Sequence, residues 1–231
     1  MSSARAQPVT LAVTDESVSG LLHVPDAAWA CYVFAHGAGA GMTHAFMGAI
    51  ADGLAERGIA TLRYQFPFME QGTRRPDPPK LAHAAVRAAV GEAARRHPRL
   101  PLFAGGKSFG GRMTSQAQAA APLPGVRGLV FLGFPLHPPK KPSNERAQHL
   151  FDVSIPMLFL QGTRDELAAL PLLEPLCAEL GARAELKLLA DADHAFHVLV
   201  RSGRKDPEVR LEALDAMETW MRSVVASTAR T

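Results

Sequence analysis

Apolar runs of four to six residues recur along this chain, separated by segments with helical periodicity, and this alternation restricts the fold more than any other feature. The runs at 30–35 (ACYVFA) and 128–133 (GLVFLG) contain no charged residue. Strands that are buried on both faces of a parallel sheet need such continuous apolar stretches. Strands that alternate with helices form a doubly wound sheet, because right-handed crossovers place helices on both of its faces.

The predicted elements follow from this pattern. We predict strands at 9–13, 20–24, 30–35, 60–66, 101–105, 128–133, 156–161 and 184–189, and helices near 45–57, 79–97, 111–121, 146–151, 167–180 and 207–227. The first two runs alternate roughly between apolar and polar residues, which favours an antiparallel hairpin at the edge of the sheet.

The length of the chain, 231 residues, suits one large α/β domain with a sizeable core. We find no internal repeat and no linker that would divide it. Irregular stretches at 67–80 and 134–146 follow predicted strand ends, where open α/β sheets bind ligands, but neither is long enough to build a cap domain. We therefore expect a single domain over residues 1–231, with a mostly parallel sheet of about eight strands, no large cap, and flexible tails at 1–7 and 227–231.

The charge balance argues against a nucleic-acid partner. Lys and Arg total 25 against 22 Asp and Glu, a net charge of +3, and the basic residues occur in scattered pairs, whereas nucleic-acid-binding surfaces gather them beside aromatic residues. The N-terminus lacks the charged start and long apolar segment of a signal peptide, and no apolar run approaches the roughly 18 residues that cross a bilayer. We expect a cytoplasmic protein, a monomer or homodimer, with no membrane partner.

The spacing of cysteines and histidines predicts no metal site. Cys31 and Cys177 fall in a predicted strand and a predicted helix, where they fit as small buried hydrophobic residues rather than as a disulfide or a metal pair. The histidines share no ligand spacing, so we expect no bound metal.

The segment FAGGKSFGGRM at 103–113 fits two different chemistries. A phosphate-binding P-loop requires G-x-x-x-x-G-K-[ST], but Pro101 stands where the first glycine is needed and strand-like residues follow it. The second pattern, G-x-S-x-G, is matched by residues 106–110 and presents a serine on a strained turn between a strand and a helix. This pattern predicts Ser108 as a nucleophile.

A serine nucleophile needs a base, and the base needs an orienting carboxylate, in the chain order Ser, acid, His for this type of turn. Asp165 follows the run at 156–161, and His194 follows the run at 184–189, so each stands just beyond a predicted strand. We predict these two as acid and base. The neighbouring alternatives are Glu166, expected to cap the next helix, and His197, expected to pack or hydrogen-bond nearby.

An oxyanion hole needs two N–H donors aimed at the developing negative charge. We assign one to Phe109, directly after the nucleophile, and the other to Ala38 in the glycine-rich loop that follows the run at 30–35. The same loop fails the G-x-G-x-x-G spacing for dinucleotides, because Met42 stands where the third glycine is required. We therefore expect no cofactor.

Four segments in this order, HGAGAGM (36–42), GKSFGGRM (106–113), LQGTRDE (160–166) and DADHAFH (191–197), resemble the α/β-hydrolase superfamily. More narrowly they resemble its small, capless dienelactone-hydrolase-like members and the KANL and testis-expressed-30-like hydrolases. The likeness covers nearly the whole chain and implies the α/β-hydrolase fold, with Ser108, Asp165 and His194 as a catalytic triad. Dienelactone hydrolases proper have cysteine at the nucleophile position, so an ordinary ester or thioester is the expected substrate rather than a lactone.

Four further residues follow or border strand ends and are candidates for substrate contacts: His36, Met42, Phe66 and Phe134. Each also fits a structural role, His36 by fixing its loop through a side-chain hydrogen bond and the other three as core. The leading hypothesis is a serine hydrolase that acts on a small acyl compound. The alternative is a catalytically silent binding or scaffold protein on the same fold, since a fold does not determine a function.

Overall fold

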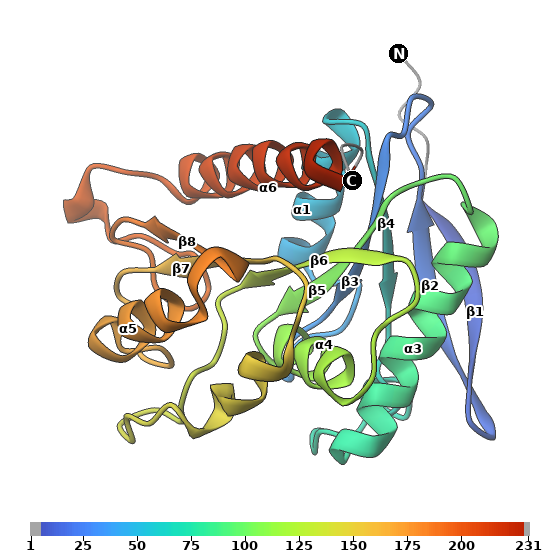
Figure 1. Ribbon diagram of the computed structural model, residues 1–231, viewed down its shortest axis with the longest axis horizontal. Helices are drawn as coiled ribbons and strands as arrows, with labels where there is room; N and C mark the ends of the chain where they lie inside the picture. The colour runs from blue at the N-terminus through green and yellow to red at the C-terminus, as the bar shows by residue number, and fades with distance from the viewer. Residues whose placement is uncertain (1–5, 229–231) are drawn as a thin grey trace.

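A mixed β-sheet forms the middle layer of the protein (Figure 1), whose structure is a computed structural model that describes residues 6–228. Its strands are β1 (Gln7–Val13), β2 (Glu16–His23), β3 (Ala30–Ala35), β4 (Ile59–Tyr64), β5 (Leu102–Lys107), β6 (Val126–Leu132), β7 (Met157–Gly162) and β8 (Ala184–Leu189). The spatial order is β1-β2-β4-β3-β5-β6-β7-β8. β2 pairs antiparallel with both β1 and β4, and all the other pairs are parallel.

Helices cover both faces of this sheet. They are α1 (Ala45–Glu56), α2 (Pro67–Glu70), α3 (Pro79–Arg96), α4 (Phe109–Ala120), α5 (Leu170–Leu180) and α6 (Asp206–Thr228), with 3-10 helices η1 (Glu145–Asp152), η2 (Gly181–Arg183) and η3 (Val200–Ser202). α1 and α6 pack on one face, while α3, α4 and α5 lie on the other (Figure 1). The predicted doubly wound, mostly parallel sheet is thus confirmed, as is the antiparallel edge hairpin.

Strand β3 shows why the apolar runs are continuous. Tyr32 and Phe34 contribute to the core under α1 and α6, whereas Cys31, Val33 and Ala35 contribute to the core under α3 and α4. All five are buried, so a polar side chain on either face of the strand would lie in an apolar layer. The sequence pattern and the two-faced burial have the same cause.

Several boundaries differ from the predicted ones. The helix predicted to start at 111 begins at Phe109, because its two glycines pack against strand ends rather than forming a loop. A Cβ on Gly111 would lie 2.8 Å from the carbonyl oxygen of Gly106 in β5, and one on Gly110 would lie 2.7 Å from the carbonyl carbon of Ala35 in β3. The helix predicted at 146–151 is the 3-10 helix η1, and the irregular stretch at 67–80 contains α2, which has Pro67 in its first turn. Of the tails predicted to be flexible, β1 includes Gln7 and α6 reaches Thr228; residues 1–5 and 229–231 lie outside the described residues.

Candidate active site

Ser108 occupies the turn between the carboxyl end of β5 and the first residue of α4. Its backbone has φ 50° and ψ −115°, in a region that non-glycine residues rarely adopt and that costs about 1–3 kcal/mol. At this turn β5 and α4 lie very close to the end of β3, and only residues without a side chain fit there. A Cβ on Gly106 would be 2.3 Å from the carbonyl oxygen of Ala35, and one on Gly110 would be 2.5 Å from that of His36. These glycines therefore allow the strained turn that exposes the serine hydroxyl.

His194 joins Ser108 to Asp165 through both of its ring nitrogens. Nε2 lies 2.8 Å from Ser108 Oγ, and Nδ1 lies 2.7 Å from Asp165 Oδ2. The side chain of Asp165 is fully buried, while that of His194 is about a quarter exposed. In this arrangement the serine hydroxyl donates to Nε2 and the Nδ1 proton is donated to the carboxylate. The three residues expected from the sequence thus lie together, although they come from three separate loops.

Gln161 is a residue of the site that the sequence analysis missed. It is fully buried near the end of β7, its Nε2 donates to Asp165 Oδ2, and its Oε1 accepts the backbone N–H of Phe134 at 2.9 Å. The other carboxylate oxygen of Asp165 accepts the N–H of Leu167 at 2.8 Å. The signal in the sequence was a single amide at the end of the apolar run MLFLQ, directly before the acidic loop.

The two alternative residues lie elsewhere. Glu166 is exposed, and His197 is bonded to the carboxylate of Asp206 at the start of α6, with Nδ1 2.9 Å from Oδ2. Asp193 closes the turn that contains His194, since its Oδ1 accepts the N–H groups of Ala195 and His197. His197 therefore holds the loop that carries His194 and does not face Ser108.

The two predicted oxyanion donors border the serine. Phe109 is the first residue of α4, where backbone N–H groups have no acceptor within the helix. Gly37, next to Ala38, is near enough that a Cβ on it would lie 3.8 Å from Ser108 Cβ. Among residues 6–228, no acceptor takes the N–H of either Ala38 or Phe109. Both N–H groups thus lack an acceptor in the described chain, and their role as oxyanion donors stays a prediction.

His36 fixes the loop that contains Ala38. Its Nε2 accepts the N–H of Phe66 at 3.0 Å, and its Nδ1 donates to the carbonyl oxygen of Gly37 at 2.7 Å. Burial lowers the pKa of His36 to about 4, so the ring is neutral at physiological pH and its tautomer follows from these two bonds.

The candidate substrate contacts are mostly enclosed. His36, Phe66 and Phe134 are fully buried, and Met42 is 7% exposed. The rings of His36 and Phe66 meet edge to face with centroids 5.0 Å apart, and the N–H of Met42 donates to Gln65 Oε1 at 3.0 Å. These contacts are structural ones, and a role in substrate binding stays a prediction for all four.

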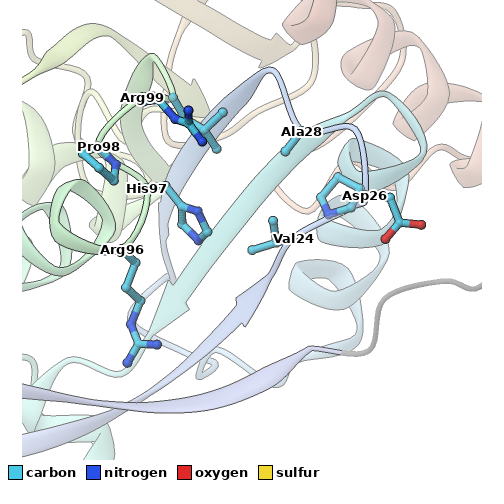
Figure 2. A pocket seen from close by; sticks show the side chains of 9 residues that line it. Val24, Asp26, Ala28, Arg96, His97, Pro98 and Arg99 are labelled. Carbon is cyan, nitrogen blue, oxygen red and sulfur yellow. The ribbon is translucent and has the colours of Figure 1, made fainter.

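A surface pocket of about 230 Å³ lies at the opposite end of the sheet (Figure 2). Its labelled lining residues include Asp26 and Ala28, before β3, and Arg96 to Arg99, from the last residue of α3 into the loop before β5. These residues precede the amino ends of the strands, whereas Ser108 follows the carboxyl end of β5. The pocket is therefore separate from the candidate active site.

The part of the chain that the structure describes offers neither a metal site nor a membrane span. Residues 6–228 contain no group of three or more His, Cys, Asp or Glu side chains able to hold a metal ion. None of the helices in that range is long and apolar enough to cross a membrane. Both cysteines are free and buried, and burial raises the pKa of Cys177 to about 11.

Comparisons with known proteins agree with the fold. A family model described as an alpha/beta hydrolase domain matches residues 28–222. Among solved structures, a lidless α/β serine hydrolase from Xanthomonas campestris superposes with a TM-score of 0.74 at 20% identity, covering 94% of this chain and 95% of its own. A dienelactone hydrolase from Anabaena variabilis gives 0.77 at 21% identity, with 96% and 99% covered. A homologue of α/β serine hydrolases from Coxiella burnetii gives 0.74 at 18% identity, with 91% and 96% covered. The family match spans most of the chain, and the chain belongs to the α/β-hydrolase domain family.

Proposed function

We propose that this α/β hydrolase is a serine esterase that cleaves a small carboxylic ester, a thioester or a related acyl compound. The observation that carries the proposal is the continuous hydrogen-bonded path from Ser108 Oγ through His194 to the buried carboxylate of Asp165, with bonds of 2.8 and 2.7 Å. A hydroxyl is a weak nucleophile at neutral pH, and a base within hydrogen-bond reach that is oriented by a third group activates it.

In the proposed reaction, His194 takes a proton from the attacking group and gives it to the leaving group in each of two steps. Ser108 Oγ attacks the acyl carbon as its proton moves to His194 Nε2, and the charge on the carbonyl oxygen is stabilised by the N–H groups of Ala38 and Phe109. The protonated imidazole then gives its proton to the leaving group, which leaves an acyl-serine. Water attacks this ester with the same base, and the acid is released. Asp165 holds the imidazole in the tautomer that leaves Nε2 able to accept.

The alternative, a silent binding protein on the same fold, needs none of this arrangement. A scaffold gains nothing from a strained serine with φ 50° or from a carboxylate buried beside an imidazole, both of which cost free energy. The serine at the nucleophile position also favours ordinary acyl transfer over the lactone opening of cysteine-containing dienelactone hydrolases.

A fluorophosphonate probe tests the proposal directly, because it phosphonylates activated serines. We expect labelling of the folded wild-type protein and none of Ser108→Ala. Ser154→Ala is the matched control, since Ser154 is exposed and lies in the loop before β7; it is expected to label like wild type. Folded wild-type protein that gives no Ser108-dependent labelling would leave the scaffold as the better description. A series of p-nitrophenyl esters from acetate upward then measures the preferred acyl length.

A further inference from the structure

Lys107 directly precedes the nucleophile, yet its side chain contacts the loop that carries the base. It is the last residue of β5, and its Nζ donates a hydrogen bond to the backbone carbonyl oxygen of His194. The ammonium thus connects two segments that are 87 residues apart and that both contribute to the site.

The surroundings of this ammonium are mostly apolar. Nζ lies 5.1 Å from the ring centroid of Phe196 and 5.9 Å from that of Phe46 on α1. The two rings meet edge to face with centroids 5.7 Å apart, so the cation rests against an aromatic pair. A Cβ built on Gly133 would be 2.8 Å from Nζ and 3.3 Å from His194 Nδ1, so the ammonium and the imidazole border the same small space.

The charged groups that face Lys107 belong to the site itself. Burial lowers the pKa of Lys107 from 10.5 to about 8, and the carboxylates of Asp165 and Asp193 act in the opposite direction. The imidazole of His194 is the third titratable group beside it. Placing a cation here opposes folding, because desolvation is the largest influence on its pKa. An apolar side chain of similar length would fill the space without that cost.

We propose that Lys107 is a positioning residue whose ammonium holds the backbone of His194, and with it the imidazole, between Ser108 and Asp165. The inference rests on the proposed function and adds to it a group that touches neither the substrate nor the reacting atoms. The hydrogen bond to the carbonyl fixes the loop, and a charged donor makes this bond stronger than a neutral amine would.

The first test compares Lys107→Met with wild type and with the control Lys80→Met, which removes an exposed lysine on α3. We expect Lys107→Met to lower kcat on p-nitrophenyl acetate roughly 10- to 100-fold, as small displacements of a catalytic group do, with little change in KM. Its Tm is expected to equal or exceed that of wild type at pH 7, because a desolvated cation is removed. The control is expected to match wild type in all three measurements.

The alkaline limb of the pH profile gives a second readout. With a pKa of about 8, Lys107 is charged below that pH and neutral above it, so the charge-dependent part of kcat/KM is present below about pH 8 and lost above it. We expect this alkaline decline in wild type and in Lys80→Met, and its absence in Lys107→Met.

Chemical rescue separates positioning from mere packing. In Lys107→Ala, added propylammonium is expected to accelerate fluorophosphonate labelling of Ser108, because the free cation occupies the vacated space; labelling avoids any aminolysis of an acyl-enzyme. The same amine is expected to leave wild type and Lys80→Ala unchanged. Unaltered kcat and pH profile in Lys107→Met would overturn the inference, as would loss of activity that merely follows loss of folded protein and resists rescue. Failure of wild type to label at Ser108 would instead overturn the proposed function itself.

Discussion

At the scale of single residues, the carboxylate of Asp165 is the most constrained group in the site. Oδ2 accepts from Gln161 Nε2 and His194 Nδ1, and Oδ1 accepts the N–H of Leu167. Donors on both oxygens prevent the carboxylate from rotating, so the direction in which the imidazole points follows from the loop after β7.

Replacing Asp165 by Asn tests that orientation. An amide can present its NH₂ group to His194 Nδ1, which then places the imidazole proton on Nε2 and removes the acceptor that Ser108 needs. We expect kcat on p-nitrophenyl acetate to fall by about 10³- to 10⁴-fold with the fold intact by circular dichroism. Glu166→Gln, an adjacent exposed carboxylate, is expected to retain wild-type kcat. Near-normal turnover by Asp165→Asn would contradict the assignment of the acid.

Gln161 allows a prediction about stability as well as rate. In Gln161→Leu the buried N–H of Phe134 loses its acceptor and Asp165 loses a donor, while the side-chain volume stays similar. A buried polar group without a partner costs about 1–3 kcal/mol, so we expect the free energy of unfolding in urea to fall by that amount and kcat to fall with it. Gln148→Leu, at an exposed position of η1, is expected to change neither quantity. A fully stable, fully active Gln161→Leu would show that the amide has no part in holding the acid.

At the scale of elements, the loop between β8 and α6, which carries His194, is held by hydrogen bonds from two other segments. Lys107 contacts it at His194, and Asp206 at the start of α6 contacts His197 and the N–H of Val198. The hydrogen bond to Asp206 raises the pKa of His197, and the same bond lowers the pKa of Asp206.

These two shifts define the pH at which the pair stabilises the loop. A raised His pKa contributes stability below its unfolded value of about 6.5 and loses it as pH rises; a lowered Asp pKa contributes above about 3.9 and loses it as pH falls. We expect the Tm difference between wild type and His197→Ala to be largest between about pH 4 and 6.5 and to shrink as the pH rises beyond that range. The measurement is thermal unfolding across this range with Lys80→Met as a surface control. A pH-independent difference would contradict the ion pair.

The same variant separates two candidate bases. His197→Ala is expected to retain turnover of p-nitrophenyl acetate, whereas His194→Ala is expected to abolish it, because only His194 lies within hydrogen-bond reach of Ser108. The opposite result would transfer the role of base to His197.

The elements also show what sequence reasoning can reach. The apolar runs predicted the strands because a strand that is buried on both faces needs consecutive apolar residues, as in β3. The candidate triad followed from chain order, because each residue stands just after a strand. Gln161 and Lys107 were not predicted, since their partners come from other loops: Phe134 lies 27 residues from Gln161, and His194 lies 87 from Lys107. Such contacts depend on which strand ends become neighbours in the sheet.

At the scale of the whole molecule, the sheet order places the site. β3 lies between β4 and β5. The chain therefore runs from β3 to β4 on one side, and from β5 to β6 on the other. The loops after β3 and β5 diverge at this point, which is the position where open α/β sheets bind ligands. They carry Ala38 and Ser108. Asp165 and His194 follow β7 and β8, at the edge of the sheet formed by β8. The loop after β8 is the one that Lys107 and Asp206 hold by hydrogen bonds.

The connections that follow β4 and β6 lead to a last prediction, about the response of the rate to substrate aggregation. Between β4 and α3, and between β6 and β7, the described chain contains only the four-residue α2 and the 3-10 helix η1, so no helical lid has to move before an ester reaches Ser108. We expect the rate with p-nitrophenyl butyrate to follow a hyperbola through its solubility limit, in the wild type and in Lys80→Met alike. Enzymes whose lid opens at an interface show a jump at that limit instead, since binding to the aggregate shifts the population toward the open state. An increase of several-fold on crossing the limit would therefore contradict an uncovered site and point to closure by the segments at 67–80 or 134–146.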